Sequence, residues 1–217
     1  MGRAGAAPRT QRFGEEQLLR AELYSIEQLE QHAKSLAGWH EVTLKPEKGR
    51  LLPRLDENEK VLMDTYEILM AAMEKKRKMA PAGEWLLDNF YLIEEQIRIT
   101  RRHFPKSYGR ELPHLINGPL AGFPRVYEMG LELVSHGDGR VDAKSLSSFI
   151  AAYQTVTPLK LGELWAIPIM LRIALIENLR RIASRIASDR RQRDAASYWA
   201  DRMIEVAEND PGKLIIE

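Results

Sequence analysis

Cysteine, an excess of charge of one sign and long uninterrupted apolar runs are all missing from this 217-residue sequence. Without cysteine, the chain forms neither a disulfide framework nor a thiolate metal site. Its 32 basic and 31 acidic residues nearly cancel, so no global charge draws it to nucleic acid or to an anionic membrane. Because the sequence is 44% hydrophobic and 29% charged, it can still bury a sizeable core.

The most apolar stretch, residues 162–181, contains polar positions that decide what kind of helix it forms. A membrane-spanning helix needs about 20 mostly apolar residues, and a central arginine is costly there. Arg172 interrupts the apolar run, and Glu177 ends the short run that follows. We therefore expect no transmembrane segment in this chain. A helix that is apolar nearly all round is typical of one surrounded by neighbours.

Helical periodicity dominates the sequence, and no convincing period-two strand is present. Ser25 with Gln28 resembles a capping box that divides the first helix, and Asp142 is a candidate N-cap. The fold predicted is all-α, an irregular bundle of six to seven helices with one long Pro/Gly-rich loop at 105–124. Predicted helices cover 15–37, 55–79, 83–103, 124–135, 143–155, 161–186 and 192–208, with 83–103 and 161–186 at the centre.

The chain divides into three parts on the same evidence. Residues 1–13 are expected to be a disordered tail, because they lack an apolar centre. Residues 14–209 form the predicted helical domain. Residues 210–217 end in an apolar run, and we interpret them as the truncated start of a following segment.

Standard catalytic and metal-binding motifs are absent from the sequence, including glycine-rich phosphate loops, His-Glu-x-x-His and Gly-x-Ser-x-Gly. The five histidines fall in different segments and show no metal-ligand spacing. Asp138 and Asp142 surround a glycine, but this pattern favours a turn followed by an N-cap over a metal loop. We therefore predict no metal and no cofactor.

Acidic side chains on the predicted helix 83–103 allow two interpretations. Buried acids with a raised pKa are suited to general acid–base catalysis, and Glu84, Asp88 and Glu163 are the candidates for a carbohydrate-active enzyme. The favoured interpretation is a polar network in which acids pair with arginines of neighbouring helices. The network candidates are Glu84, Asp88, Asn89, Glu95, Arg98, Arg125, Glu163, Arg172 and Glu177.

The loop 105–124 allows a further pair of interpretations. Tyr108, Arg110 and Phe123, with Arg125, are candidate contacts for a protein partner. The alternative, which we favour, is that these side chains fix the loop to the rest of the domain.

Several uncommon strings occur in a specific order over residues 17–205, nearly the whole chain. They are LRAELYSIEQLEQHA (19–33), RLDENE (54–59), EWLLDNFYLIEEQ (84–96), GPLAGFPRVY (118–127) and GELWAIP (162–168). In these strings the chain resembles the N-terminal region of cyclic β-1,2-glucan synthases, which are very large bacterial inner-membrane glycosyltransferases. One departure is Lys160, where the family pattern has a threonine that caps the next helix with Glu163. The helix is therefore expected to begin at Thr157 and Pro158 instead.

The resemblance implies a cytoplasmic segment that precedes the membrane helices of a protein using UDP-glucose to make cyclic glucan. No catalytic motif of the family matches a position here, so the expected role is non-catalytic, either scaffolding or regulatory. The expected partner is the remainder of the parent chain, with its membrane and catalytic domains. The alternatives are a free-standing helical protein-interaction module and the carbohydrate-active enzyme described above.

Overall fold

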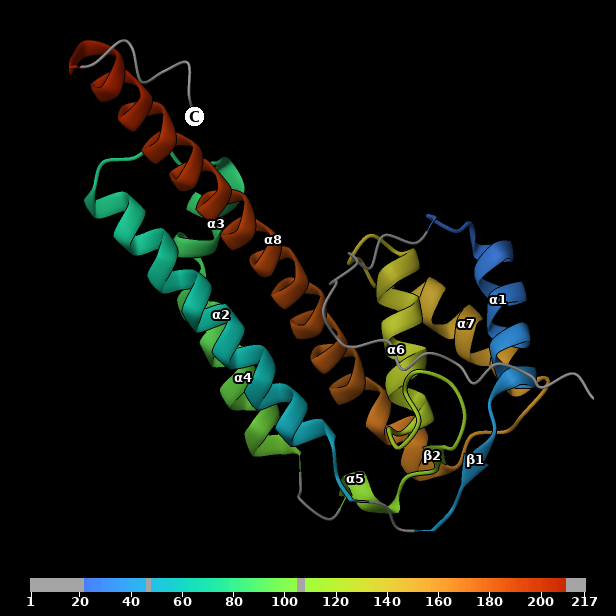
Figure 1. The fold of residues 1–217 in the computed structure, drawn as a ribbon. Coiled ribbons are helices and arrows are strands. Elements are labelled where there is room, and N and C mark those ends of the chain that lie inside the picture. Colours follow the sequence, from blue (N-terminus) through green and yellow to red (C-terminus); the bar gives the residue numbers. More distant parts are fainter. Residues whose placement is uncertain (1–21, 46–47, 105–107, 210–217) are drawn as a thin grey trace, which may run out of the picture.

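The chain folds mainly into helices, as a computed structural model shows for residues 22–45, 48–104 and 108–209 (Figure 1). The all-α prediction is confirmed, and the described part holds eight helices and one two-stranded sheet. The elements are α1 (Ile26–Trp39), β1 (Val42–Thr43), α2 (Leu51–Glu74), α3 (Pro81–Asp88), α4 (Phe90–His103), α5 (Tyr108–Glu111), β2 (His114–Leu115), α6 (Arg125–His136), α7 (Ala143–Gln154) and α8 (Leu161–Asn209). The predicted tail at 1–13 and the predicted segment 210–217 lie outside the described residues.

Helix α1 begins where the capping box predicted a break. The Ser25 hydroxyl accepts a hydrogen bond from the backbone N–H of Gln28, and the Gln28 side chain accepts one from the backbone N–H of Ser25. These two bonds satisfy donors that the first helical turn otherwise leaves unpaired. Residues 22–25 are not helical, so the predicted start at 15 is wrong for this part.

The predicted helix 83–103 is two helices, α3 and α4, joined at Asn89. Asn89 leaves helical geometry, with φ −108° and ψ 8°, and its side-chain amide donates to the carbonyl of Trp85 at 2.8 Å. Asparagine competes for backbone hydrogen bonds in this way, which is why it interrupts a helix that apolar periodicity alone predicts to continue.

Helix α8 replaces the two predicted helices 161–186 and 192–208 with one element of 49 residues. At 1.5 Å per residue it is about 74 Å long. It begins at Leu161, not at the predicted Thr157–Pro158. The backbone N–H of Lys160 donates to the Glu163 carboxylate at 2.9 Å, so half of a capping box forms without a Thr or Ser side chain. Pro168 lies inside this helix and does not end it.

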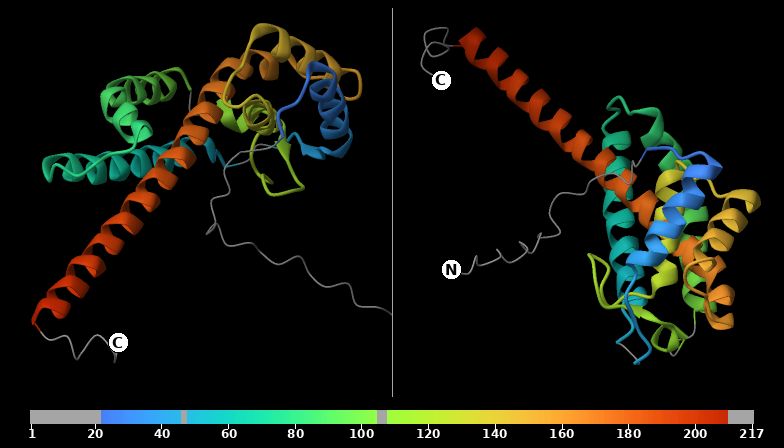
Figure 2. Two further views of the ribbon diagram at one scale, coloured as in Figure 1. Left: turned by 90° about the horizontal axis from the view of Figure 1, so that it is seen from above. Right: turned by 90° about the vertical axis from the view of Figure 1, so that its right-hand side faces the viewer.

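Two hydrophobic cores lie along α8 (Figures 1 and 2). The first joins α1, α6 and α7 to the start of α8 and includes Val134, Tyr153 and Ile173, all fully buried. The second joins α2, α3 and α4 to the middle of α8 around Leu62 and Ala183. Figure 2 shows the C-terminal part of α8 extending beyond the other helices. No described helix is long and apolar enough to cross a membrane.

The predicted 105–124 loop contains α5 and β2, followed by turns that lead into α6. Strands β1 and β2 pair antiparallel, with Val42 opposite Leu115. Gly118 has φ +74° and packs closely against the Trp39 ring, where no side chain fits. The loop is therefore attached to the end of α1 by backbone pairing and by this close approach.

Candidate functional site

The first candidate site is a buried ion pair between the start of α6 and the start of α8. Arg125 donates from Nε to Glu163 Oε1 at 2.7 Å and from Nη2 to Glu163 Oε2 at 2.8 Å. Nη2 also donates to the carbonyl of Pro158 at 2.9 Å. Burial lowers the pKa of Arg125, but the bonds to Glu163 outweigh it, so the pKa stays above its usual value. This bidentate geometry fixes the angle between the two helices.

Tyr153 of α7 extends this pair toward α1. Its ring lies under the guanidinium of Arg125, whose central carbon is 5.8 Å from the ring centre. Its hydroxyl lies 2.8 Å from Nδ1 of His40, and Nε2 of His40 lies 3.2 Å from Glu128. Burial raises the pKa of Tyr153 to about 12, so its hydroxyl remains protonated. The network consequently joins α1, α6, α7 and α8 in the first core.

A second buried cluster surrounds Glu177 in the middle of α8. Arg54 of α2 donates from Nε at 2.9 Å and from Nη2 at 2.5 Å to the two carboxylate oxygens. Arg180 and Arg181 approach the same carboxylate at 3.0 and 3.4 Å. Burial raises the pKa of Glu177, but the bonds and charges of Arg54 and Arg180 outweigh it and lower the pKa to about 2. The carboxylate is therefore ionised at any ordinary pH.

A pocket of about 440 Å³ opens beside this cluster. Its polar wall holds Arg50, Arg54, Arg181, Glu57 and Glu177, and Phe123 and Tyr127 are on its aromatic wall. Three guanidinium groups against two carboxylates leave a net positive charge. Arg50 donates to the carbonyl of Ala121 at 3.2 Å, so the 118–123 turn forms one rim. Such a mixed aromatic and guanidinium lining suits a polar or anionic ligand.

The acids predicted on helix 83–103 do not form a buried network. Glu84, Asp88, Glu95 and Arg98 are exposed, and the Glu95–Arg98 contact is a surface pair at 3.8 Å. The apolar neighbours Leu86, Phe90, Ile93 and Ile97 take the buried face of α3 and α4 instead. The prediction that these acids are buried is therefore wrong.

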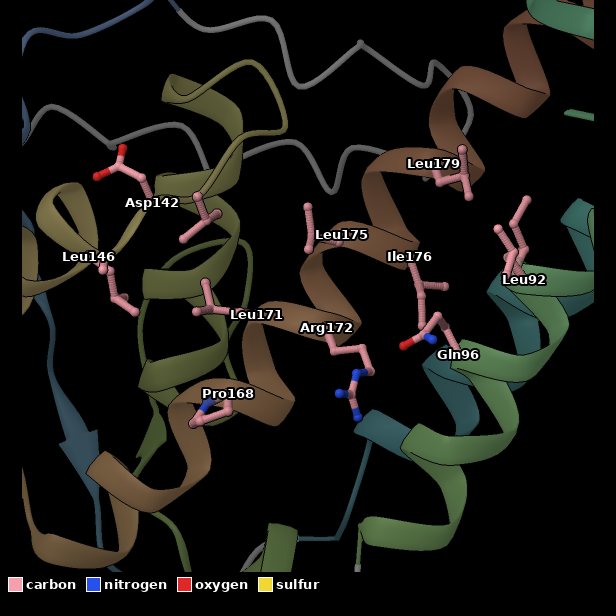
Figure 3. A pocket seen from close by; sticks show the side chains of 13 residues that line it. Leu92, Gln96, Asp142, Leu146, Pro168, Leu171, Arg172, Leu175, Ile176 and Leu179 are labelled. Atoms are coloured by element: carbon pink, nitrogen blue, oxygen red, sulfur yellow. The ribbon is translucent and has the colours of Figure 1, made fainter. Parts of the chain in front are cut away.

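Arg172 is also placed differently from the prediction. We expected it to pair with an acid among residues 84–98, but within the described chain it makes no hydrogen bond or ion pair. It is half-buried and lines an apolar groove of about 490 Å³ between α4, α7 and α8. Figure 3 shows its side chain on the α4 side of the groove, with Leu171, Leu175 and Pro168 along α8. Glu177 and Arg181 do form the predicted pair.

The loop residues predicted to contact a partner are separated. Phe123 is half-buried in the arginine-lined pocket, with its ring centre 5.5 Å from that of Tyr127. Arg110 is exposed at the end of α5, and Arg125 is fully engaged by Glu163. The side chain of Tyr108 lies outside the described atoms. Phe123 and Arg125 thus contribute to attaching the loop.

One constellation was missed from the sequence. His32 of α1 and the pair Glu132 and His136 of α6 place one ligand atom each within 4.8 Å of one another. The signal was present in part, because Glu132 and His136 are four residues apart and share a helical face. The third member lies in another helix, about 100 positions earlier in the chain.

The fold and these clusters define a helical segment joined by buried ion pairs. No protein-family model matches the chain. It is similar to the cyclic beta-(1,2)-glucan synthase NdvB of Rhizobium meliloti (strain 1021), with 40% identity over 156 residues. That match covers 71% of this chain and 5% of the synthase, so the chain is homologous to a small segment of that relative. The resemblance to a cyclic β-1,2-glucan synthase that the sequence predicted is confirmed.

Proposed function

We propose that this chain is a non-catalytic N-terminal segment of a cyclic β-1,2-glucan synthase, with a scaffolding or regulatory role. The complete protein would polymerise glucose from UDP-glucose into cyclic glucan at the bacterial inner membrane, with this segment on the cytoplasmic side. The observation that carries the proposal is the 40% identity over 71% of the chain.

The positions and ion pairs of the acidic residues support a non-catalytic role. Glu163 and Glu177 are buried and neutralised by arginines, so neither is available to exchange protons with a substrate. Glu84 and Asp88 are exposed on α3, which packs far along α8 from Glu163 (Figure 1). The three acids of the enzyme alternative therefore do not converge on one site, which general acid–base catalysis requires.

The far end of α8 supports an interaction with the remainder of the parent chain. Four large apolar side chains there are 57–60% exposed: Tyr198, Trp199, Met203 and Ile204. An apolar group of this kind on a soluble surface is typical of a contact site. The same surface is the observation behind the second candidate, a free-standing helical module that binds a separate protein.

A segment exchange tests the proposal. We would replace the matching 156-residue segment of the Rhizobium meliloti synthase with the homologous residues of this chain, and delete that segment in a second variant of the synthase. Membranes carrying each protein would be assayed for cyclic glucan made from UDP-glucose. We expect the exchanged protein to be active, the deletion to be impaired, and the isolated chain to transfer no glucose.

Two results would contradict the proposal. Glucose transfer by the purified chain alone would show a catalytic domain. Full activity of the deletion, together with capture of a separate protein by α8, would favour the free-standing module.

A further inference from the structure

We propose that His32, Glu132 and His136 form a binding site for one Zn²⁺ ion. This goes beyond the proposed function and does not depend on it. The three side chains come from α1 and α6, next to the first core, at a place where neither the ion-pair network nor the arginine-lined pocket extends.

The two spacings that involve Glu132 are close to those of a tetrahedral ion, and all three ligand atoms lie within 4.8 Å of one another, so the two imidazoles close on the ion as it binds. Zinc bonds of about 2.0–2.1 Å place neighbouring ligand atoms about 3.3–3.4 Å apart. His136 Nε2 and Glu132 Oε2 are 3.4 Å apart. His32 Nε2 and Glu132 Oε2 are 2.8 Å apart, a hydrogen-bond distance that opens by about half an ångström when the metal replaces the proton.

A second observation concerns the proton on His136. Its Nδ1 lies 2.8 Å from the carbonyl oxygen of Glu22, which only accepts hydrogen bonds, so Nδ1 carries a proton. With the proton on Nδ1, Nε2 is the ring nitrogen that faces the Glu132 carboxylate at 3.4 Å, and its lone pair is the one that a metal ion would use. A backbone carbonyl that holds the far nitrogen is the usual outer contact of a metal-binding histidine.

The surroundings hold His136 in place and leave room for a further ligand. The ring of Tyr24 stacks on that of His136 with centres 3.7 Å apart. The side chains of His32 and Glu132 are 25% and 29% exposed, so water reaches the open fourth position. Two imidazoles and one carboxylate favour zinc over magnesium or calcium, which prefer all-oxygen sites.

Binding of the ion would join α1 to α6 through coordinate bonds. Nε2 of His32 lies at hydrogen-bond distance from Glu132, so a proton on that nitrogen must leave it before the nitrogen can bind the ion. The ion adds a stabilising contact to the N-terminal helix, since a metal that binds only the folded chain raises the folded population.

The test uses the 217-residue chain, free of any polyhistidine tag and stripped with a chelator. Titration calorimetry with ZnCl₂ should give one ion per chain, and thermal unfolding should shift to higher temperature when zinc is added. X-ray absorption of the zinc-loaded protein should show a first shell of nitrogen and oxygen only, with two imidazoles. This last measurement needs no variant.

Variants then assign the ligands. His32→Gln and Glu132→Gln should each weaken zinc binding by about tenfold or more. His103→Gln is the matched control, because His103 is exposed at the end of α4 and should leave the affinity unchanged. Circular dichroism would verify that each variant is folded.

Three results of the zinc titrations would overturn the site: no zinc binding by the stripped chain, unchanged affinity in Glu132→Gln, or loss of binding in His103→Gln. The last would mean that zinc binds a surface histidine. An absorption spectrum with fewer than two imidazoles would overturn it even if both variants fail to fold.

Discussion

Arg125 and Arg172 have the same side chain, but we predict that removing Arg125 lowers the stability of the fold far more than removing Arg172. Arg125 is 4% exposed and makes a bidentate pair with Glu163, whereas Arg172 is half-buried at the edge of a groove. Arg125→Ala leaves a buried carboxylate without its partner and should lower the free energy of unfolding by about 3–5 kcal/mol. Arg172→Ala should change it by about 0.5 kcal/mol. Urea unfolding followed by circular dichroism measures both.

The double variant Arg125→Met with Glu163→Met provides the control. Removing both charges leaves no buried charge unpaired, although the Pro158 carbonyl and the Lys160 N–H lose their partners, so part of the lost stability should return. Equal costs for Arg125→Ala and Arg172→Ala would contradict the burial difference on which the prediction rests.

Glu177 should make the stability of the chain depend on acid pH. Its pKa falls from 4.5 to about 2 on folding, so its carboxylate is ionised more readily in the folded chain. The stabilisation is fully present above pH 4.5 and is lost as the pH falls toward 2, a change of about 3 kcal/mol. Glu177→Gln should flatten that part of the curve of unfolding free energy against pH.

Glu57→Gln is the matched comparison for Glu177. Glu57 bonds the same Arg54, but its side chain is 64% exposed, so its pair contributes little. Its removal should leave the acid dependence intact. If Glu177→Gln kept the wild-type slope between pH 4.5 and 2, the lowered pKa would have to belong to other carboxylates.

Two helix starts were predictable because their capping signals are local. Ser25 and Asp142 each cap the helix that follows, and both caps use side chains within three residues of the bonds they make. Lys160 shows the limit of such patterns. Glu163 supplies its half of the capping box even though residue 160 has no capping side chain.

Helix ends and breaks were harder to predict because neighbours decide them. The break at Asn89 divides one periodic stretch into α3 and α4, and the absence of a break near residue 190 joins two predicted helices into α8. Arg190 donates to the carbonyl of Lys78 at 2.9 Å, a contact with a segment far away in the sequence that supports α8 there. Periodicity within one segment carries no information about such contacts.

For the candidate sites, too, local features were predictable and contacts between distant segments were not. The residue types of the buried pairs were predicted, but the burial of Glu84 and Asp88 was not correct, since their helices direct other faces inward. His32 meets Glu132 and His136 only because α1 packs beside α6. Assembling these three side chains required the tertiary fold.

In the described part of the molecule, two hydrophobic cores pack along one long helix, α8. The two halves of α8 therefore differ in how deeply their side chains are buried. Ile173 is fully buried in the first core, whereas Trp199 is 60% exposed beyond it. Ile173→Ala should lower the free energy of unfolding by about 2–5 kcal/mol, because it leaves a cavity. Trp199→Gln should change it by about 0.5 kcal/mol or less.

In the synthase that carries this segment, the order of the two substitutions should be reversed when glucan synthesis is measured instead of stability. If the far half of α8 contacts the remainder of the parent chain, Trp199→Gln removes a large apolar anchor from that contact and should reduce glucan synthesis, although the isolated segment is as stable as before. The comparison is made with Tyr91→Gln, which removes an aromatic side chain that is 65% exposed on α4, away from that half. Equal activity of the two variants would place the contact elsewhere on the molecule. Reduced activity for Trp199→Gln alone would locate it on the part of α8 that the two cores leave uncovered.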